Sequence, residues 1–434
     1  MSQTISEGPF FNLKAVVQQT GLSPDTLRAW ERRYGLPAPN RSSGGHRLYS
    51  RRDIEIIHWL IARQQEGLSI KRAVELWRQL EAEGAVLSQL PVFVRPSAPL
   101  GTGETLVRLR EEWIAACLAY DEQRAEQTIA QAFSFYSPEI VATELLQKAV
   151  AWIGEGWYQG QVTVQQEHFC SVLTERRLET LIQSAPSASR PGRILAACPP
   201  GELHVIGLLL LTLFLRRRGW EVISLGADVP TEQLEVAIRT IQPRLVILAA
   251  QQLSTAATLC EAAQKLQAER VPVAYGGLIF NRIPELCRHI PGHFLGETLE
   301  LALVRIESFM AIPPPTLQVE SIPTVYLQAR DHYQERQLLL EADLIQRLPA
   351  SEVALSDVLR ANQELGLRIH AALTLGVMDL LDIEIAWLEG MLSHYRISPG
   401  SLHTYLKAYG QVAQKHLDQR GEPIVTWFRK FVGK

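Results

Sequence analysis

The sequence is short of cysteine, of signal-peptide character and of long apolar runs. Its five cysteines in 434 residues are scattered without a Cys-x-x-Cys pair. This pattern argues against structural zinc and predicts a reduced, cytoplasmic protein. The first eight residues are polar and acidic, unlike a signal peptide. The longest apolar run, near residues 205–215, falls short of the ~20 residues of a membrane helix, so no membrane partner is expected.

Charge is spread unevenly along the chain. The net charge is −3. Residues 1–80 contain twelve Lys and Arg against seven Asp and Glu, a net +5, so the remainder carries −8. A basic segment on an acidic body predicts that the first domain contacts a polyanion.

Clusters of proline and glycine divide the chain into four domains, a multidomain α and α/β organisation. The predicted segments are a DNA-binding domain at 8–80, a linker at 81–104, a helical bundle at 105–186, an α/β domain at 190–310 and a helical domain at 320–434. In the α/β domain, short apolar runs at 193–198, 220–225, 244–250 and 271–275 alternate with helix-like stretches. This alternation predicts a Rossmann-like parallel sheet, whose ligands lie beyond the carboxyl ends of its strands.

The N-terminal residues have the pattern of a helix–turn–helix. Residues 11–20 and 24–34 are the expected helices, with a glycine turn between them. A glycine pair, Gly44-Gly45, then predicts a wing. The side chains expected to contact DNA are Arg28, Arg32, Arg33, Arg47 and Tyr49. The alternative is a small helical domain with solvated arginines.

These motifs resemble the MerR family. The stretch LSPDTLRAWERRYGL at residues 22–36 and the stretch GGHRLYS at residues 44–50 carry the resemblance. It implies a winged helix–turn–helix that binds a palindromic double-stranded DNA operator. A homo-oligomer, a dimer or a tetramer, is expected, but the linker at 81–104 argues against dimerisation through the long helix that the family uses after the wing.

A second motif, Glu-x-His-x-x-Gly, follows the first predicted strand of the α/β domain. It consists of Glu202, His204 and Gly207. A histidine at a strand's carboxyl end can reach a ligand above the sheet. Glu202 can hydrogen-bond its other ring nitrogen and strengthen it as a ligand. A histidine at a loop–helix junction can equally be a cap or a surface residue.

This motif resembles the Asp-x-His-x-x-Gly signature of cobalamin-binding domains. The resemblance implies that His204 is the lower axial ligand of cobalt and that the nucleotide tail passes a pair of glycines. The remaining cofactor contacts that it implies are Gly226, Asp228, Gly276 and Gly277. Where the family carries a serine after the third strand, this chain has Ala249, and Gln251 or Ser254 is expected to substitute.

The helical segment before the sheet contains Trp157, then nine residues, then Glu167 and His168. This spacing resembles the CarH/LitR type of adenosylcobalamin-dependent photoreceptor repressor. The resemblance implies that Trp157 covers the upper face of cobalamin and that Glu167 accepts hydrogen bonds from the adenosyl ribose. The alternative is a tryptophan of the bundle core beside a surface Glu-His pair.

One residue departs from that type. The photoreceptors have a histidine directly after the tryptophan, which captures cobalt after photolysis, and this chain has Tyr158. A phenol, with an ordinary pKa of ~10, binds cobalt poorly. Adenosylcobalamin binding is therefore expected, but not the same photoadduct.

The C-terminal segment adds about 110 residues without cysteine. Its histidines are His332, His370, His394, His403 and His416. The first interpretation is a packing or dimerisation domain. The alternative is a second ligand pocket, loosely similar to helical bilin-binding domains, for a bilin held without a thioether bond.

Together these features predict a cobalamin-dependent, light-responsive DNA-binding repressor that is not an enzyme. One alternative is a regulator whose altered cobalamin site senses another ligand. The other is a cobalamin enzyme, such as a mutase or a methyl carrier, but no segment has the length or repeat of a substrate barrel.

Overall fold

The computed structural model describes most of the chain and divides it into two compact units, residues 1–98 and residues 99–434. The described residues are 11–20, 22, 24–41, 47–65, 70–82, 103–315, 317, 319–348, 355–394 and 399–432. Each unit is presented separately.

The described residues of the N-terminal unit form four helices and a small antiparallel sheet of order β1-β3-β2. Its elements are β1 (Phe11–Asn12), α1 (Leu13–Thr20), α2 (Pro24–Tyr34), β2 (Asn40–Arg41), β3 (Arg47–Tyr49), α3 (Arg51–Gln65) and α4 (Ile70–Ala82). Trp59 of α3 and Trp77 of α4 meet edge to face, with ring centroids 5.4 Å apart. The tip of the predicted wing, Gly44–His46, lies outside the described residues.

The second unit is built around five parallel strands in the order β5-β4-β6-β7-β8. The strands and their helices are β4 (Arg193–Ala197), α10 (Ile206–Arg217), β5 (Glu221–Gly226), α11 (Leu234–Ile241), β6 (Leu245–Ala249), α12 (Leu253–Ala268), β7 (Val273–Gly276), α13 (Leu278–Arg282), β8 (His293–Phe294) and α14 (Leu299–Ala311). Helices α10 and α14 cover one face, and α11, α12 and α13 cover the other. The strand order places the topological switch point, where such sheets bind ligands, between β4 and β6.

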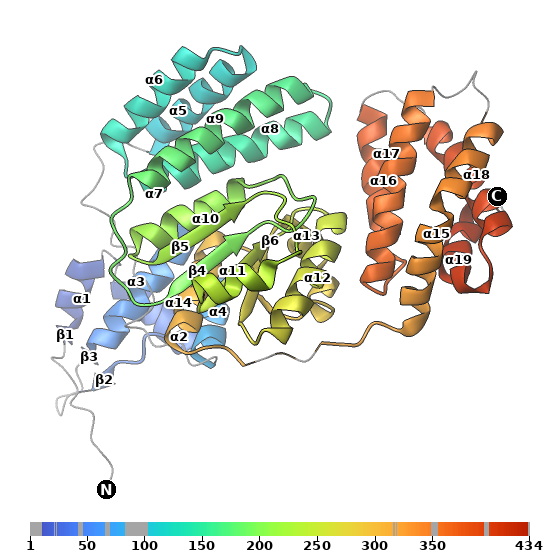
Figure 1. The fold of residues 1–434 in the computed structure, drawn as a ribbon. Helices are drawn as coiled ribbons and strands as arrows, with labels where there is room; N and C mark the ends of the chain where they lie inside the picture. The colour runs from blue at the N-terminus through green and yellow to red at the C-terminus, as the bar shows by residue number, and fades with distance from the viewer. Residues whose placement is uncertain are drawn as a thin grey trace, which may run out of the picture. The chain divides into compact units, whose positions relative to one another are not determined.

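A helical bundle packs on the α10 side of the sheet (Figure 1). It consists of α5 (Gly103–Leu118), α6 (Glu122–Phe135), α7 (Pro138–Ile140), a π-helical turn at Val141–Gln147, α8 (Lys148–Tyr158) and α9 (Val164–Gln183). Side chains of α10, such as Leu208 and Leu211, are buried in one hydrophobic core with the bundle. Helix α10 therefore packs between the bundle and the sheet.

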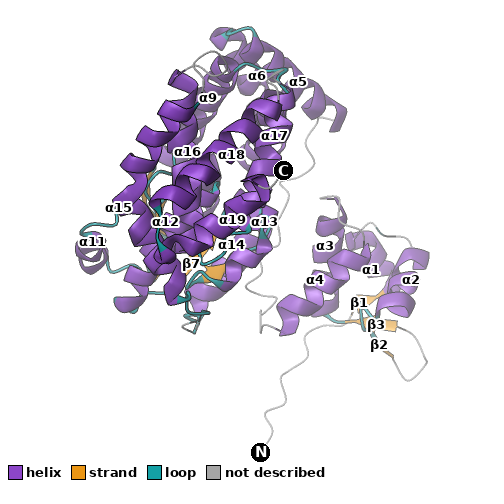
Figure 2. Ribbon diagram, turned by 90° about the vertical axis from the view of Figure 1, so that its right-hand side faces the viewer, coloured by secondary structure: helices purple, strands orange, loops and turns teal. Residues whose placement is uncertain are grey.

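The C-terminal helices pack on the opposite side, against α12 (Figure 2). They are α15 (Thr324–Arg347), α16 (Leu355–Thr374), α17 (Leu380–His394), α18 (Pro399–His416), a 3-10 turn at Gln419–Gly421 and α19 (Glu422–Val432). Ala371 of α16, Leu375 directly after α16 and Leu380 of α17 are buried among the residues of α12 and α13. The C-terminal helices are thus anchored to the sheet domain.

The predicted fold class is confirmed: helical domains flank a parallel α/β core. The four apolar runs correspond to β4, β5, β6 and β7, whereas the two-residue strand β8 was not predicted. Helix α5 begins at Gly103, inside the predicted linker. Within the described ranges, no helix combines the length and apolarity that crossing a membrane requires.

Candidate functional site

A buried carboxylate organises the carboxyl edge of the sheet. Glu202, in the loop after β4, has no exposed surface. One carboxylate oxygen accepts hydrogen bonds from the backbone N–H of His204, at 2.9 Å, and from its ring Nδ1, at 2.7 Å. The other accepts from the backbone N–H of Gln251 and the hydroxyl of Thr255, both at 2.6 Å. Glu202 therefore ties the β4 loop to the end of β6 and the first turn of α12.

The electrostatics of the pair follow from these contacts. Burial acts to raise the pKa of Glu202, but hydrogen bonds from His204, Thr255 and Gln251 outweigh it and leave that pKa below its ordinary value. The hydrogen bond to Glu202 raises the pKa of His204, against the effect of burial. The His204 side chain is 59% exposed. With Nδ1 held by Glu202, its Nε2 is the ring nitrogen available to a ligand.

Neighbouring loops are drawn to the same edge. Asp228, after β5, accepts a hydrogen bond from the N–H of Gly201 at 2.8 Å and donates its own N–H to the Glu202 carbonyl at 3.0 Å. Gly226 ends β5 with a φ of +80°, in the left-handed region. Asp228 thus supports the loop that holds Glu202 in place, a role that its sequence position alone does not reveal.

Gln251 lies between the starts of two helices. Its side-chain oxygen accepts the N–H of Leu278 at 2.8 Å. Its side-chain nitrogen lies 3.7 Å from the position that a Cβ would take at Gly207, which opens α10. Ser254 is half-buried in the first turn of α12. Of the two suggested substitutes for the family's serine, Gln251 is the one whose side chain bridges the sheet edge.

The paired glycines permit a close approach of β7 to β6. Gly277 has a φ of +130°, and a Cβ there would overlap the carbonyl oxygen of Ala250. At Gly276 the nearest side-chain atom to such a Cβ is 3.9 Å away, in Leu295. Gly277 is therefore the glycine that the backbone path requires.

Sequence patterns did not point to the apolar rim of this edge. Leu203 after β4 is 67% exposed, Leu225 of β5 is 38% exposed and Leu278 after β7 is 56% exposed. Exposed leucines thus follow or end three strands at the carboxyl edge of the sheet, and apolar side chains of this kind line the sites of organic cofactors. Their signal in the sequence is only an apolar residue beside each loop motif.

The bundle presents polar groups from α9. Glu167 accepts hydrogen bonds from His168 Nδ1 and from the Ser171 hydroxyl, both at 2.7 Å. The charges of Glu167 and of Glu175, two turns later, both contribute to the raised pKa of His204. The carboxylates on this face of α9 thus act on the histidine of the β4 loop. His168 itself is largely exposed, with 74% of its side chain accessible.

Trp157 lies at the C-terminal end of α8, half-buried against the bundle core. Its ring centroid is 6.5 Å from that of Trp387 in α17. Tyr158, the next residue, stacks on Trp387 with centroids 5.5 Å apart and an interplanar angle of 28°. The structure therefore gives Tyr158 a partner in the C-terminal domain.

The arginines of the predicted DNA-reading helix are exposed. Arg28, Arg32 and Arg33 are exposed residues of α2, and Arg28 lies one helical turn before the adjacent Arg32 and Arg33. Arg78 of α4 donates to the carbonyl of Tyr34 at 2.6 Å and so caps the C-terminal end of α2. The helix presents a cationic surface that suits phosphates and base edges.

The two residues predicted from the wing behave differently. Tyr49 is fully buried, and burial, followed by the charge of Glu31, raises its pKa to about 12. The prediction that Tyr49 contacts DNA was therefore wrong: it is a core residue on strand β3. Arg47 donates from Nε to the carboxylate of Glu31 at 2.8 Å, which ties the wing strand to α2.

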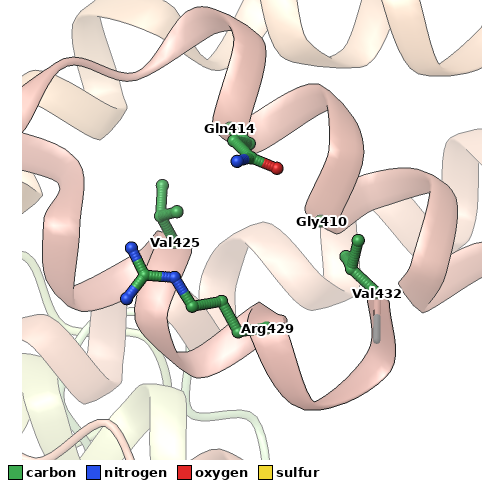
Figure 3. A pocket seen from close by; sticks show the side chains of 5 residues that line it. All are labelled: Gly410, Gln414, Val425, Arg429 and Val432. Carbon is green, nitrogen blue, oxygen red and sulfur yellow. The ribbon is translucent and has the colours of Figure 1, made fainter. Parts of the chain in front are cut away.

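Two of the C-terminal histidines, His332 and His416, contact residues of neighbouring segments. His332 is buried, and its Nε2 accepts the N–H of Asp418 at 3.2 Å. His416 contacts the Asp343 carboxylate at 2.8 Å. Helices α18 and α19 border a pocket of about 250 Å³ that contains no histidine (Figure 3). Its lining residues are Gly410, Gln414, Val425, Arg429 and Val432.

Comparison with known families gives three matches along the chain. The MerR HTH family regulatory protein model matches residues 11–80. Two models described as B12 binding domain match residues 109–182 and 192–301. The class is therefore a MerR-type helix–turn–helix regulator with B12-binding domains.

Individual relatives narrow the class. The HTH-type transcriptional repressor CarH of Myxococcus xanthus is 33% identical over 298 residues, which cover 66% of this chain and 95% of CarH. The repressor CarA of the same organism is 33% identical over 239 residues, or 54% of this chain and 75% of CarA. The chain belongs to the CarH/CarA family of transcriptional repressors.

A solved structure, the monomethylamine corrinoid protein of Methanosarcina barkeri, is similar at 19% identity with a TM-score of 0.40. The alignment covers 48% of this chain and 100% of the corrinoid protein. The family models end at residue 301, and α15–α19 lie beyond them.

Replacing Glu202 tests the organising role of its carboxylate. In Glu202→Gln, the amide cannot accept from all four donors, so we expect the free energy of unfolding of the ligand-free protein to fall by about 2–3 kcal/mol. Urea unfolding followed by circular dichroism measures this. Glu221→Gln is the control, because Glu221 and its partner Arg193 are each 47% exposed. Equal midpoints for the two variants would contradict the assignment.

Proposed function

We propose that this repressor is controlled by adenosylcobalamin and that light reverses the control. The observation that carries the proposal is the Glu202–His204 pair at the switch point of the sheet. His204 would supply a nitrogen ligand to the cofactor, and Trp157 and Glu167 of the bundle would contact its upper group.

The residues at the sheet edge fit a corrinoid. His204 would hold the metal through Nε2, since Glu202 occupies Nδ1 and fixes the tautomer. The exposed Leu203, Leu225 and Leu278 offer an apolar platform for a large ring. The close approach at Gly277 leaves the β7 edge without a side chain, where an extended tail can pass.

The bundle residues suit the upper face. Trp157 offers an aromatic surface, and the Glu167 carboxylate, already held by Ser171 and His168, offers an acceptor for hydroxyl groups. Adenosylcobalamin, when bound, supplies a cobalt–carbon bond that light can cleave. Removal of the adenosyl group would take away what Trp157 and Glu167 contact.

Such a site can control assembly only if the two ligand states favour different arrangements of the protein. Contacts between the bundle and the upper ligand exist in one state and not in the other, so they provide that difference. We infer that the adenosyl state stabilises a homo-oligomer, a dimer or a tetramer, that binds a palindromic operator. Tyr158, engaged by Trp387, is not expected to replace the lost group on cobalt.

DNA contact is assigned to α2. Arg28, Arg32 and Arg33 would reach phosphates and base edges in the major groove, while Arg47 would position the wing strand through Glu31. Non-enzymatic function is part of the proposal, because the chain joins its B12-binding domains to a DNA-binding unit. A bilin in the C-terminal domain remains the alternative for a second ligand, but the pocket of about 250 Å³ there is small for a tetrapyrrole.

Arg32→Ala tests the DNA-reading helix. We expect operator affinity to fall about tenfold, or the slope of log affinity against log salt to drop by about one if the contact is to phosphate. Titration of a duplex, selected by the full chain from a random library, over a range of salt concentrations measures both. Arg239→Ala, which removes an exposed arginine of α11 in the other unit, should match the wild type.

His204→Ala tests the lower ligand. We expect the variant to lose bound adenosylcobalamin on desalting, because the apolar platform alone lacks the metal bond. Visible absorbance of the desalted protein measures retention, and His403→Ala, an exposed histidine of α18, is the control. Full retention by His204→Ala would refute the ligand assignment. No retention by the wild type would favour the altered site that senses another molecule.

The assembly step is tested on the wild type by gel filtration and operator binding. With adenosylcobalamin in darkness, we expect a larger particle and tighter DNA binding than without ligand, because the bundle contacts are then complete. Green light should reverse both changes. Identical elution and binding in darkness and after illumination would exclude light as the input.

A further inference from the structure

Helix α17 connects parts of the second unit that lie on opposite faces of the sheet. The bundle packs on the α10 face, and the C-terminal helices pack on the α12 face. Contacts from α17 nevertheless reach the end of α8 in the bundle and the end of α13 beside the sheet. Both contacts converge on one side chain, Trp387.

On the bundle side, Trp387 meets the last two residues of α8. Its ring stacks on Tyr158 at 5.5 Å and lies 6.5 Å from that of Trp157. The Tyr158 hydroxyl donates to the backbone carbonyl of Trp387 at 3.4 Å, and the Tyr158 ring meets that of His394 edge to face at 5.5 Å. The end of α8 is thus held along more than one turn of α17.

On the sheet side, the guanidinium of Arg282 lies 5.8 Å from the centre of the Trp387 ring. Arg282 ends α13, the helix that begins directly after Gly277 at the carboxyl end of β7. Glu384, one turn before Trp387, is 4.0 Å from Arg282 and accepts a hydrogen bond from Arg368 at 3.3 Å. Its side chain is only 8% exposed, so the hydrogen bond from Arg368 ties α17 to α16, while the Arg282 guanidinium lies at the limit of ion-pair distance.

We propose that α17 is a third element of the ligand enclosure, in which Trp387 is a positioning residue that holds the end of α8, and with it Trp157, in place over the sheet edge. The inference rests on the proposed function, because it assigns Trp157 to the upper face of cobalamin. The C-terminal domain then sets how firmly the upper axial group is held, and it changes its own contacts when α8 moves.

The junction contains a sharp steric constraint. Gly390, one turn after Trp387, faces the Tyr158 hydroxyl so closely that an added Cβ would overlap that oxygen, while the Tyr158 Cζ would remain at 3.4 Å. Gly390→Ala should therefore push α8 and α17 apart. Tyr158→Phe removes the oxygen, so the double variant should close the junction again. Gly154→Ala is the control in α8, because nothing lies within 4 Å of the added methyl group.

The test uses the full chain with two measurements. The first is amide hydrogen exchange at the end of α8 in the ligand-free protein. The second is the dissociation rate of adenosylcobalamin and of hydroxocobalamin, which lacks the adenosyl group. We expect Gly390→Ala to speed exchange and to release adenosylcobalamin about tenfold faster, the scale of an aromatic contact, with a smaller change for hydroxocobalamin. Gly390→Ala/Tyr158→Phe should restore both values.

The outcomes separate the two proposals. Unchanged exchange and unchanged release in Gly390→Ala would overturn the inference, as would faster exchange with unchanged release of adenosylcobalamin. If the wild type binds no cobalamin, the proposed function is wrong. The role of α17 in enclosing the ligand is then wrong too, even if amide exchange at the end of α8 is faster in Gly390→Ala. If Gly390→Ala does not fold, Trp387→Leu removes the stacked ring without adding volume, and the same two measurements decide.

Discussion

The hydrogen-bonded carboxylate of Glu202 is the interaction on which the ligand edge of this protein depends. A charge without exposed surface is stable only when its acceptor capacity is filled, and here four donors fill it. Those donors come from the β4 loop, the end of β6 and the first turn of α12. The same bonds that make the burial tolerable also orient His204, so stability and ligand geometry cannot be varied independently at this position.

Local spacing explains what the sequence predicted well. Glu202 and His204 are two residues apart, and their contact needs only a turn at a strand's end. The parallel strands were visible as short apolar runs between helices. Thr255 was not predicted, because its bond to Glu202 spans 53 positions and depends on how β6 aligns with β4. The partner of Tyr158 was equally hidden, since Trp387 is 229 residues away.

In the DNA-binding unit, the two-residue periodicity of strand β3 explains why the prediction of a DNA contact failed for Tyr49. Arg47 and Tyr49 lie two residues apart in β3, so their side chains share one face of the strand. That face turns inward: Tyr49 is buried and Arg47 binds Glu31. The arginines of α2 follow helical spacing instead, and they remain exposed as predicted. An aromatic residue beside a basic one in a short strand is therefore weak support for a DNA contact.

Helix α10 is apolar around most of its circumference, and its residues from Leu210 to Leu215 are all buried. A helix of this kind needs cover on every side. The bundle covers one side of α10 and the sheet covers the other. Loss of either the bundle or the sheet would expose an apolar surface of α10 to water. Transfer of the bundle or of the sheet domain to another protein would therefore keep α10 covered only when the two domains are transferred together. The C-terminal helices, docked on the far face through α12, could be gained or lost without exposing that helix.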